Sequence, residues 1–285
     1  MIRRYTYKTA LLYSALVLLG LFFLAPLYVM LVASFKPLDE VRASSIIAFP
    51  QNWTIEPWLK AWSSACSSLD CTGIKPFFFA TFEIAIPAMV LAIFIGAMNG
   101  YVMAKWRAKW ADILFGLLLI GSFVPLQLFL IPLAVTLREL NIYGTTVGLI
   151  LIHTVYGVPL TTMLFRNFYI TLPNELVWAA VMDGAGFFKI FFSVILPLSP
   201  AIFIVAVILV FSGIYNDFLF ALTFGDTSKR PIMAAVQNIV SSSYGIKEHN
   251  MNIAAVMIAA LPTLLLFLVA GKFFVRGLTQ GAVKG

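Results

Sequence analysis

The few polar side chains next to long apolar runs define the chemistry open to this chain. Tyr215, Asn216 and Asp217 follow one apolar run, and Gln127 lies within another. Amide and carboxylate groups make hydrogen bonds, and a tyrosine ring offers a flat apolar face. These four residues are therefore candidates for lining a path for a polar solute. A structural role is an equal alternative, in which Gln127 joins helices and Asp217 caps local structure.

Catalytic and metal chemistry find little support in the same sequence. The two histidines, His153 and His249, lie far apart, and neither has a second histidine or carboxylate at ligand spacing. We expect His153 to be a packing or hydrogen-bonded pore residue. The chain also lacks the G-x4-GK[ST] motif that cradles nucleotide phosphates. It is therefore not expected to be an enzyme, to hold a metal or to bind a cofactor.

The composition identifies an integral membrane protein, because 61% of the residues are hydrophobic and only 11% are charged. The net charge of +7 is modest, so nucleic acid is not an expected partner. We predict an all-α protein with about six spans, at roughly 10–33, 77–104, 111–135, 145–165, 198–221 and 251–271. Arg3, Arg4 and Lys8 precede the first span and predict a cytosolic N-terminus, and an even number of spans returns the C-terminus to that side.

Segment 173–197 lies between two spans and is too interrupted to cross a bilayer. Pro173 suits a first helical position, and Glu175 lies in the first turn, where the helix dipole favours an anion. Gly184 and Gly186 supply a break, and Pro197 ends the second short helix. This pattern predicts a cytosolic helix–turn–helix.

Cys66 and Cys71 lie in the long loop after the first span, on the side where disulfides persist. Their closeness and location favour a disulfide over two free thiols. Zinc is poorly supported, because no histidine lies near in the sequence.

The 173–197 segment resembles the EAA loop of permease subunits of ATP-binding-cassette (ABC) importers. That family pattern is Glu-Ala-Ala, three residues, Gly, nine residues, an aliphatic, any residue, Leu-Pro. The matching positions here are Ala179, Ala180, Gly184, Val194, Leu196 and Pro197, and Asp183-Gly184-Ala185 is similar to the favoured Asp-Gly-Ala. The family glutamate is replaced by Trp178, so any ion pair that it would make is weakened.

Other segments resemble carbohydrate permeases in particular. These are Phe49 to Thr54, Pro125-Leu126-Gln127 with Ile131-Pro132, Tyr215 to Leu219, and the ending Gly277 to Gly285, which is similar to the second permease of maltose-type systems. The resemblance implies a type I ABC importer permease fold. It also implies an N-terminal helix and outer loop (1–75), a permease core with its coupling loop (76–272), and a cytosolic tail (273–285). Gly277, Thr279, Gln280 and Gly281 are then expected in an extended strand against the ATPase dimer.

The resemblance further implies the partners: a second permease subunit, two ATP-binding-cassette subunits that bind ATP and magnesium, an extracytoplasmic solute-binding protein and the lipid bilayer. The chain is expected in the cell (inner) membrane, where it forms half of a sugar path. Asn99-Gly100-Tyr101 and Phe165 to Tyr169 look most like glucose/mannose permeases. Import of an oligosaccharide (maltose or trehalose type) or of glycerol phosphate are alternatives. A more distant one is an ion-coupled secondary transporter, which would need paired intramembrane carboxylates.

Overall fold

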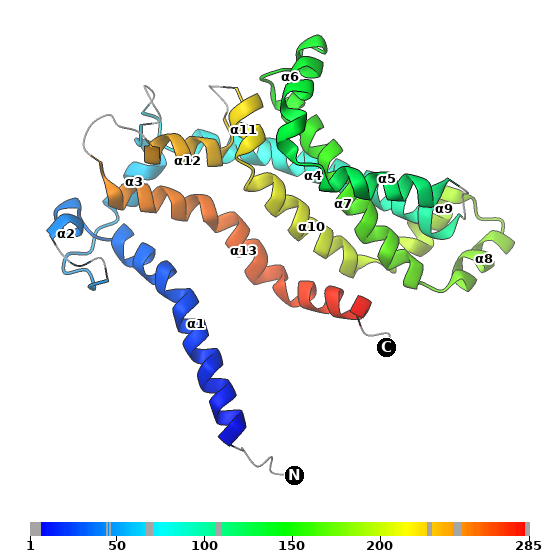
Figure 1. Cartoon of the computed structure of the whole chain (residues 1–285), viewed down its shortest axis with the longest axis horizontal. Helices are drawn as coiled ribbons and strands as arrows, with labels where there is room; N and C mark the ends of the chain where they lie inside the picture. The colour runs from blue at the N-terminus through cyan, green and yellow to red at the C-terminus, as the bar shows by residue number, and fades with distance from the viewer. Residues whose placement is uncertain are drawn as a thin grey trace. The chain divides into compact units, whose positions relative to one another are not determined.

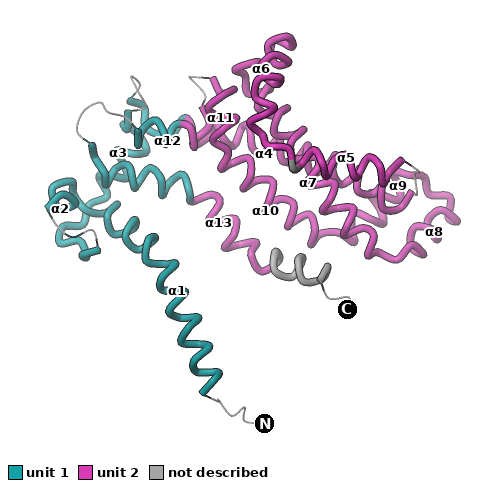
Figure 2. The backbone as a smooth tube through the Cα atoms, viewed as in Figure 1, with its two compact units in different colours: residues 1–76, 235–260 teal, residues 77–234, 261–285 magenta. Residues whose placement is uncertain are grey.

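The computed structural model describes residues 7–43, 45, 47–66, 71–106, 110–226, 230–241 and 247–282, and its regular elements are helices (Figure 1). The chain divides into two compact units (Figure 2). Unit 1 comprises residues 1–76 and 235–260, and unit 2 comprises residues 77–234 and 261–285. Residues 235–260, which we expected in the core region 76–272, thus belong to unit 1.

Four helices are long and apolar enough to cross a membrane, within the residues that the structure describes. They are α1 (Tyr7–Ser34), α4 (Lys75–Lys105), α7 (Thr146–Thr171) and the stretch 249–272 of α13 (His249–Ala282). Two bent helix pairs bring the number to six if each pair forms one span. The predicted all-α membrane fold is therefore confirmed, with about six spans.

Two of the expected spans are not single continuous helices. Instead of one helix over 111–135, α5 (Ala111–Phe123) is followed by a short 3-10 helix (η1, Leu126–Phe129) and by α6 (Leu130–Glu139), at a bend of 97°. The bend has a local cause: Val124 takes the extended conformation that a following proline favours. Instead of a helix over 198–221, α10 (Pro200–Tyr215) ends six residues early, before α11 (Leu219–Phe224).

In unit 2, α4 and α7 pack so closely that glycine is required between them. A Cβ at Gly96 would collide with the side chain of Thr161, and one at Gly100 would lie 2.7 Å from the backbone nitrogen of Arg166. The Thr161 hydroxyl donates a hydrogen bond of 2.8 Å to the Ala92 carbonyl across this contact. Gly96 and Gly100 are four residues apart, the small-x3-small spacing that lets two membrane helices approach closely.

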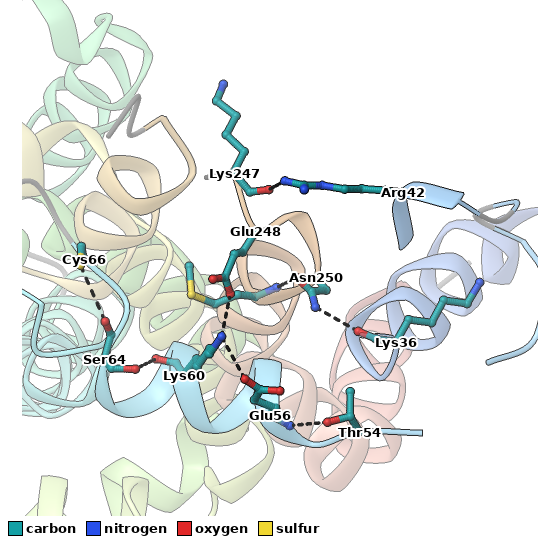
Figure 3. Close-up of polar contacts among 11 residues, drawn as sticks. Lys36, Arg42, Thr54, Glu56, Lys60, Ser64, Cys66, Lys247, Glu248 and Asn250 are labelled. Carbon is teal, nitrogen blue, oxygen red and sulfur yellow. Dashed lines mark hydrogen bonds and ion pairs between the residues drawn. The ribbon is translucent and has the colours of Figure 1, made fainter. Parts of the chain in front are cut away.

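In unit 1, polar contacts tie the segment after α1 to the start of α13 (Figure 3). Lys60, in α3 (Glu56–Ser63), pairs with Glu56 at 3.0 Å and with Glu248 at 3.4 Å. The Asn250 amide donates a hydrogen bond of 3.0 Å to the Lys36 carbonyl, 214 residues away in sequence. The first turn of α13 and the loop after α1 therefore form one structure. The same unit also includes α2 (Leu38–Ala43) and the C-terminal part of α12 (Ile232–Ser241, of which 235–241 lie in this unit).

The expected disulfide between Cys66 and Cys71 is present. Backbone hydrogen bonds from Gly73 to Ala65 and from Ile74 to Ala61 hold the two sides of this turn together. Residues 67–70 lie outside the described part of the chain.

The C-terminal tail differs from the expected extended strand. Helix α13 continues to Ala282, so Gly277, Thr279, Gln280 and Gly281 are helical, and residues 283–285 lie outside the described part. Extending an existing helix adds one hydrogen bond for each residue fixed, without a new nucleation cost. This gain can outweigh the low helix propensity of the glycines in the tail.

Candidate functional site

Segment 173–197 folds as a helix–turn–helix, as predicted. Helix α8 (Asn174–Met182) is followed by Gly184 in the left-handed conformation (φ 74°) and then by α9 (Phe187–Ile190). The amide of Gly184 bonds to the Val181 carbonyl and that of Ala185 to the Ala180 carbonyl, both at 2.9 Å. This is the Schellman arrangement that ends a helix at a glycine.

Two local expectations for this segment have different outcomes. Glu175 lies in the first turn of α8, as expected. Pro173 does not occupy the first helical position but precedes it, with an extended backbone (ψ 133°). After α9 a π-helical turn (η2, Phe191–Ile195) leads to Pro197 and into α10, at a bend of 92°.

The outward side of α8 is apolar and exposed. Trp178 is 56% exposed, Val181 50% and Met182 86%, whereas Val177 of the same helix is buried. We call Trp178, Val181 and Met182 the α8 face. Of the other residues expected in a docking surface, Ala179, Asp183, Gly184 and Pro197 are exposed and Ala180, Ala185 and Leu196 are half-buried. A contiguous exposed apolar patch of this kind marks a site of protein or membrane contact.

The C-terminal end of α4 anchors this segment at both of its helices. The Lys105 ammonium donates hydrogen bonds of 2.6 Å to the Leu172 carbonyl and 2.8 Å to the Asn174 side chain, at the start of α8. The Tyr101 ring packs against Phe187 and Phe191, with ring centroids 5.0 and 5.5 Å apart. A displacement of α8 and α9 would therefore be transmitted to α4.

A second feature of unit 2 is a cavity of about 740 Å³ between α5, η1, α6, α7 and α10. Its lining is predominantly apolar. The polar lining residues are Ser122, Thr136, His153, Tyr156 and Asp217. The hydroxyls of Ser122 and Thr136 each donate 2.9 Å hydrogen bonds to carbonyls four residues earlier in their own helices. Both hydroxyl protons are therefore already donated within their own helices.

His153 and Asp217 form a buried pair on the wall of this cavity. The Nε2 atom of His153 lies 3.9 Å from Oδ2 of Asp217, and their side chains are 7% and 13% exposed. The Asp217 carboxylate also accepts hydrogen bonds from the backbone nitrogens of Ala221 at 3.0 Å and Phe220 at 3.4 Å. It therefore caps the first turn of α11 and faces His153 at the same time.

Of the four residues predicted to line a solute path, only Asp217 lines this cavity. Gln127 and Asn216 are exposed elsewhere. Tyr215 is fully buried, and its ring packs against Phe82 at 5.6 Å and Phe211 at 5.4 Å, so it offers no open face. In this structure the ring of Tyr215 is therefore not accessible as a flat face for a sugar.

Sequence reasoning missed the partners of two residues. Lys105 was visible only as a positive charge at the end of a span, and its bonds to Leu172 and Asn174 bridge 67 and 69 residues. His153 is alone in sequence, and its neighbour Asp217 lies 64 residues later. The signal available was an ionisable residue inside an apolar run, which is costly there unless it serves a function.

Comparison with known proteins places these features in a family. Residues 88–281 match the family described as binding-protein-dependent transport system inner membrane component. A probable ABC transporter permease of Pyrococcus horikoshii is 43% identical over 189 residues, which cover 65% of this chain and 68% of the relative. A xylose/arabinose import permease of Haloferax volcanii is 34% identical over 228 residues, with 72% and 73% covered.

The fold is similar to that of a solved bacterial ABC transporter involved in the import of the acidic polysaccharide alginate. The TM-score is 0.78 over 96% of this chain and 99% of that one, at 15% sequence identity, which supports the fold alone. The family match covers more than half of the chain and includes the 173–197 segment and the cavity. This chain therefore belongs to the binding-protein-dependent transport system inner membrane components.

Proposed function

We propose that this chain is a permease subunit of an ATP-driven sugar importer. The observation that carries the proposal is the 173–197 helix–turn–helix, which exposes the apolar α8 face and is anchored to α4 through Lys105 and Tyr101. Such an element is suited to bind a separate ATPase subunit and to transmit the motion of that subunit to a membrane helix. The cavity in unit 2 provides this chain's share of the solute path.

The partners follow from this assignment. A second permease completes the path, two ABC subunits bind ATP and magnesium, and an extracytoplasmic binding protein delivers the sugar. We propose that Trp178 changes how the chain binds the ATPase. Because an exposed tryptophan stands where the family has glutamate, α8 contacts the ATPase by burying apolar surface instead of by forming an ion pair. The helical tail with Gly277, Thr279, Gln280 and Gly281 is proposed as a further contact with the ATPase dimer.

The substrate class is supported by the carbohydrate-permease motifs and by the xylose/arabinose relative. Within this class we propose a monosaccharide such as glucose or mannose, with oligosaccharides and glycerol phosphate as the alternatives. Membrane insertion with both termini in the cytosol is part of the same proposal, since it places segment 173–197 and residues 273–282 on the side of the ATPase.

The test is reconstitution of the chain in liposomes with its second permease, ATPase subunits and binding protein. We expect uptake of D-glucose or D-mannose that requires ATP, and ATP hydrolysis that the sugar-loaded binding protein stimulates. Uptake of maltose and of glycerol 3-phosphate tests the alternative substrates. Uptake that proceeds without the ATPase subunits and follows an imposed ion gradient would instead identify a secondary transporter.

A further inference from the structure

We propose that His153 and Asp217 form a hydroxyl-binding site for an uncharged sugar on the wall of the unit 2 cavity. The inference rests on the proposed function and names a contact within the same path. It starts from one distance: Nε2 of His153 and Oδ2 of Asp217 are 3.9 Å apart, which is too long for a direct hydrogen bond. Two polar atoms at such a separation are typically bridged by a third group.

A hydroxyl group fits this gap. For an oxygen about 2.8 Å from both atoms, the angle Nε2–O–Oδ2 would be roughly 90°. This angle is close to the one between the directions in which a hydroxyl donates and accepts. The hydroxyl hydrogen is then donated to the Asp217 carboxylate, and its oxygen accepts from the Nε2–H of His153. Sugars carry several hydroxyls that can donate and accept at once, so one of them satisfies both side chains.

The rest of the wall favours the carbon skeleton of a sugar. Tyr156 and Phe220 also line the cavity, with ring centroids 5.9 Å apart, and the His153 ring contacts Phe220 edge-to-face at 5.4 Å. Aromatic rings beside a hydrogen-bonding pair offer an apolar surface to the C–H groups of a sugar while its hydroxyls are bound.

The charges exclude acidic sugars as the preferred solute. Among the described residues that line the cavity, Asp217 is an acid and none is lysine or arginine. A carboxylate on the solute would have to leave water without a cationic partner and approach a like charge, which is costly in an apolar cavity. The site therefore fits neutral sugars and not uronic acids.

The pair is also held rigidly enough to select one orientation. Two backbone amides of α11 fix the Asp217 carboxylate. His153 lies in the third turn of α7 and is 6% exposed. Groups fixed before the solute arrives lose little conformational entropy on binding it.

The test uses the complete importer in liposomes with D-glucose, D-xylose, melibiose and D-glucuronate. His153→Phe keeps the ring that packs on Phe220 but removes the hydrogen bond, and Asp217→Asn keeps an oxygen to cap α11 but removes the charge. The matched control is Thr154→Val, next to His153 in α7, where the buried Thr154 hydroxyl bonds to the Ile150 carbonyl of its own helix and the residue does not line the cavity. We expect about tenfold slower uptake of the neutral sugars in His153→Phe, as for one lost hydrogen bond, and wild-type uptake in Thr154→Val.

Monodeoxy analogues of a transported sugar separate binding from a purely structural role. In the wild type, uptake of one analogue should be slower than uptake of the parent sugar by more than about tenfold, because the missing hydroxyl removes the bonds to both side chains. In His153→Phe the parent-to-analogue ratio should be about tenfold smaller, because only the bond to Asp217 is then left to lose. The same binding protein serves both importers, so its own selectivity cancels in the ratio. His153→Gln, which restores a donor, should recover part of the discrimination.

Equal loss for the parent and every analogue in His153→Phe, or no loss at all, would overturn the proposed site. Wild-type uptake of D-glucuronate at the rate of D-glucose would overturn the preference for neutral sugars. These results differ from failure of the proposed function, which would appear as a wild-type importer that takes up none of the sugars with ATP.

Discussion

Lys105, in the last turn of α4, donates a hydrogen bond of 2.6 Å to the carbonyl oxygen of Leu172, the residue that caps the C-terminus of α7. The same ammonium bonds to Asn174 at the start of α8. A cation at the end of a helix satisfies carbonyls that lack partners and opposes the negative end of the helix dipole. One side chain therefore joins two membrane helices to the helix that carries the α8 face.

We predict that Lys105→Met weakens the coupling between the membrane helices and the ATPase subunits. Methionine fills similar space but leaves the Leu172 carbonyl without this partner, at a cost of about 1–3 kcal/mol. Stimulation of ATP hydrolysis by the sugar-loaded binding protein and sugar uptake should fall together, while assembly persists. The control is Lys189→Met, at an exposed lysine of α9. Equal behaviour of the two variants would contradict the role of Lys105.

Gly184→Val should also impair coupling, for a conformational reason. A Cβ at Gly184 would meet no atom within 4 Å, so the cost comes from its φ of 74°, which β-branched residues avoid. We expect about 1–3 kcal/mol of strain at the end of α8 and loss of binding-protein-stimulated ATP hydrolysis. Membrane insertion should persist, because the spans are untouched.

Two substitutions serve as controls for this prediction. Gly184→Asn should retain most of the coupling, because asparagine tolerates the left-handed region. Gly186→Ala should also be tolerated, since φ at Gly186 is −77° and the space around it is open. Normal stimulation in Gly184→Val would show that docking does not depend on this turn.

The Cys66–Cys71 disulfide should protect both thiols from alkylation until a reductant is added. Replacing both cysteines by serine should leave uptake largely intact, because closing so short a loop restricts the unfolded chain by only about 2 kcal/mol. Mass spectrometry of the alkylated protein, with and without reductant, measures the pairing. Modification of both thiols without reductant would show that the bond is absent in the membrane.

The loop after α1 should loosen at acidic pH through Glu40. Its carboxylate accepts hydrogen bonds from the backbone amide of Gln51 at 2.8 Å and from that of Asn52 at 3.1 Å. The Gln51 bond, followed by that from Asn52 and by the charge of Lys36, lowers the pKa of Glu40 below its usual 4.5. The native loop therefore binds the proton less tightly than the unfolded chain does.

This contribution to stability is present above pH 4.5 and is lost as the pH falls through the lower native pKa. Hydrogen exchange of the Gln51 and Asn52 amides, corrected for intrinsic exchange rates, should show constant protection from neutral pH down to that range and lower protection below it. The Glu40→Gln variant should lack this step. A step of the same size in the variant would assign it to another group.

The sequence by itself determined the elements that depend on local chemistry. Continuous apolar runs are long enough to span a bilayer only as helices, because lipid leaves no other partner for the backbone. The turn at Gly184 and the first turn of α8 at Glu175 could also be predicted from the sequence. Both depend on local chemistry, since glycine and an acidic residue act on their immediate neighbours. The Cys66–Cys71 bond could be predicted as well, because it joins residues only five positions apart.

Only the tertiary structure decided which distant side chains meet. Lys105 reaches Leu172 and Asn174, and His153 approaches Asp217, through packing of helices whose angles follow from side-chain ridges and close glycine contacts and not from any local pattern. Tyr215 and Asp217 are two residues apart, yet one is buried among aromatic rings and the other lines the cavity. This separation arises because α10 ends at Tyr215 and the chain changes direction before α11, so neighbouring residues face different surroundings.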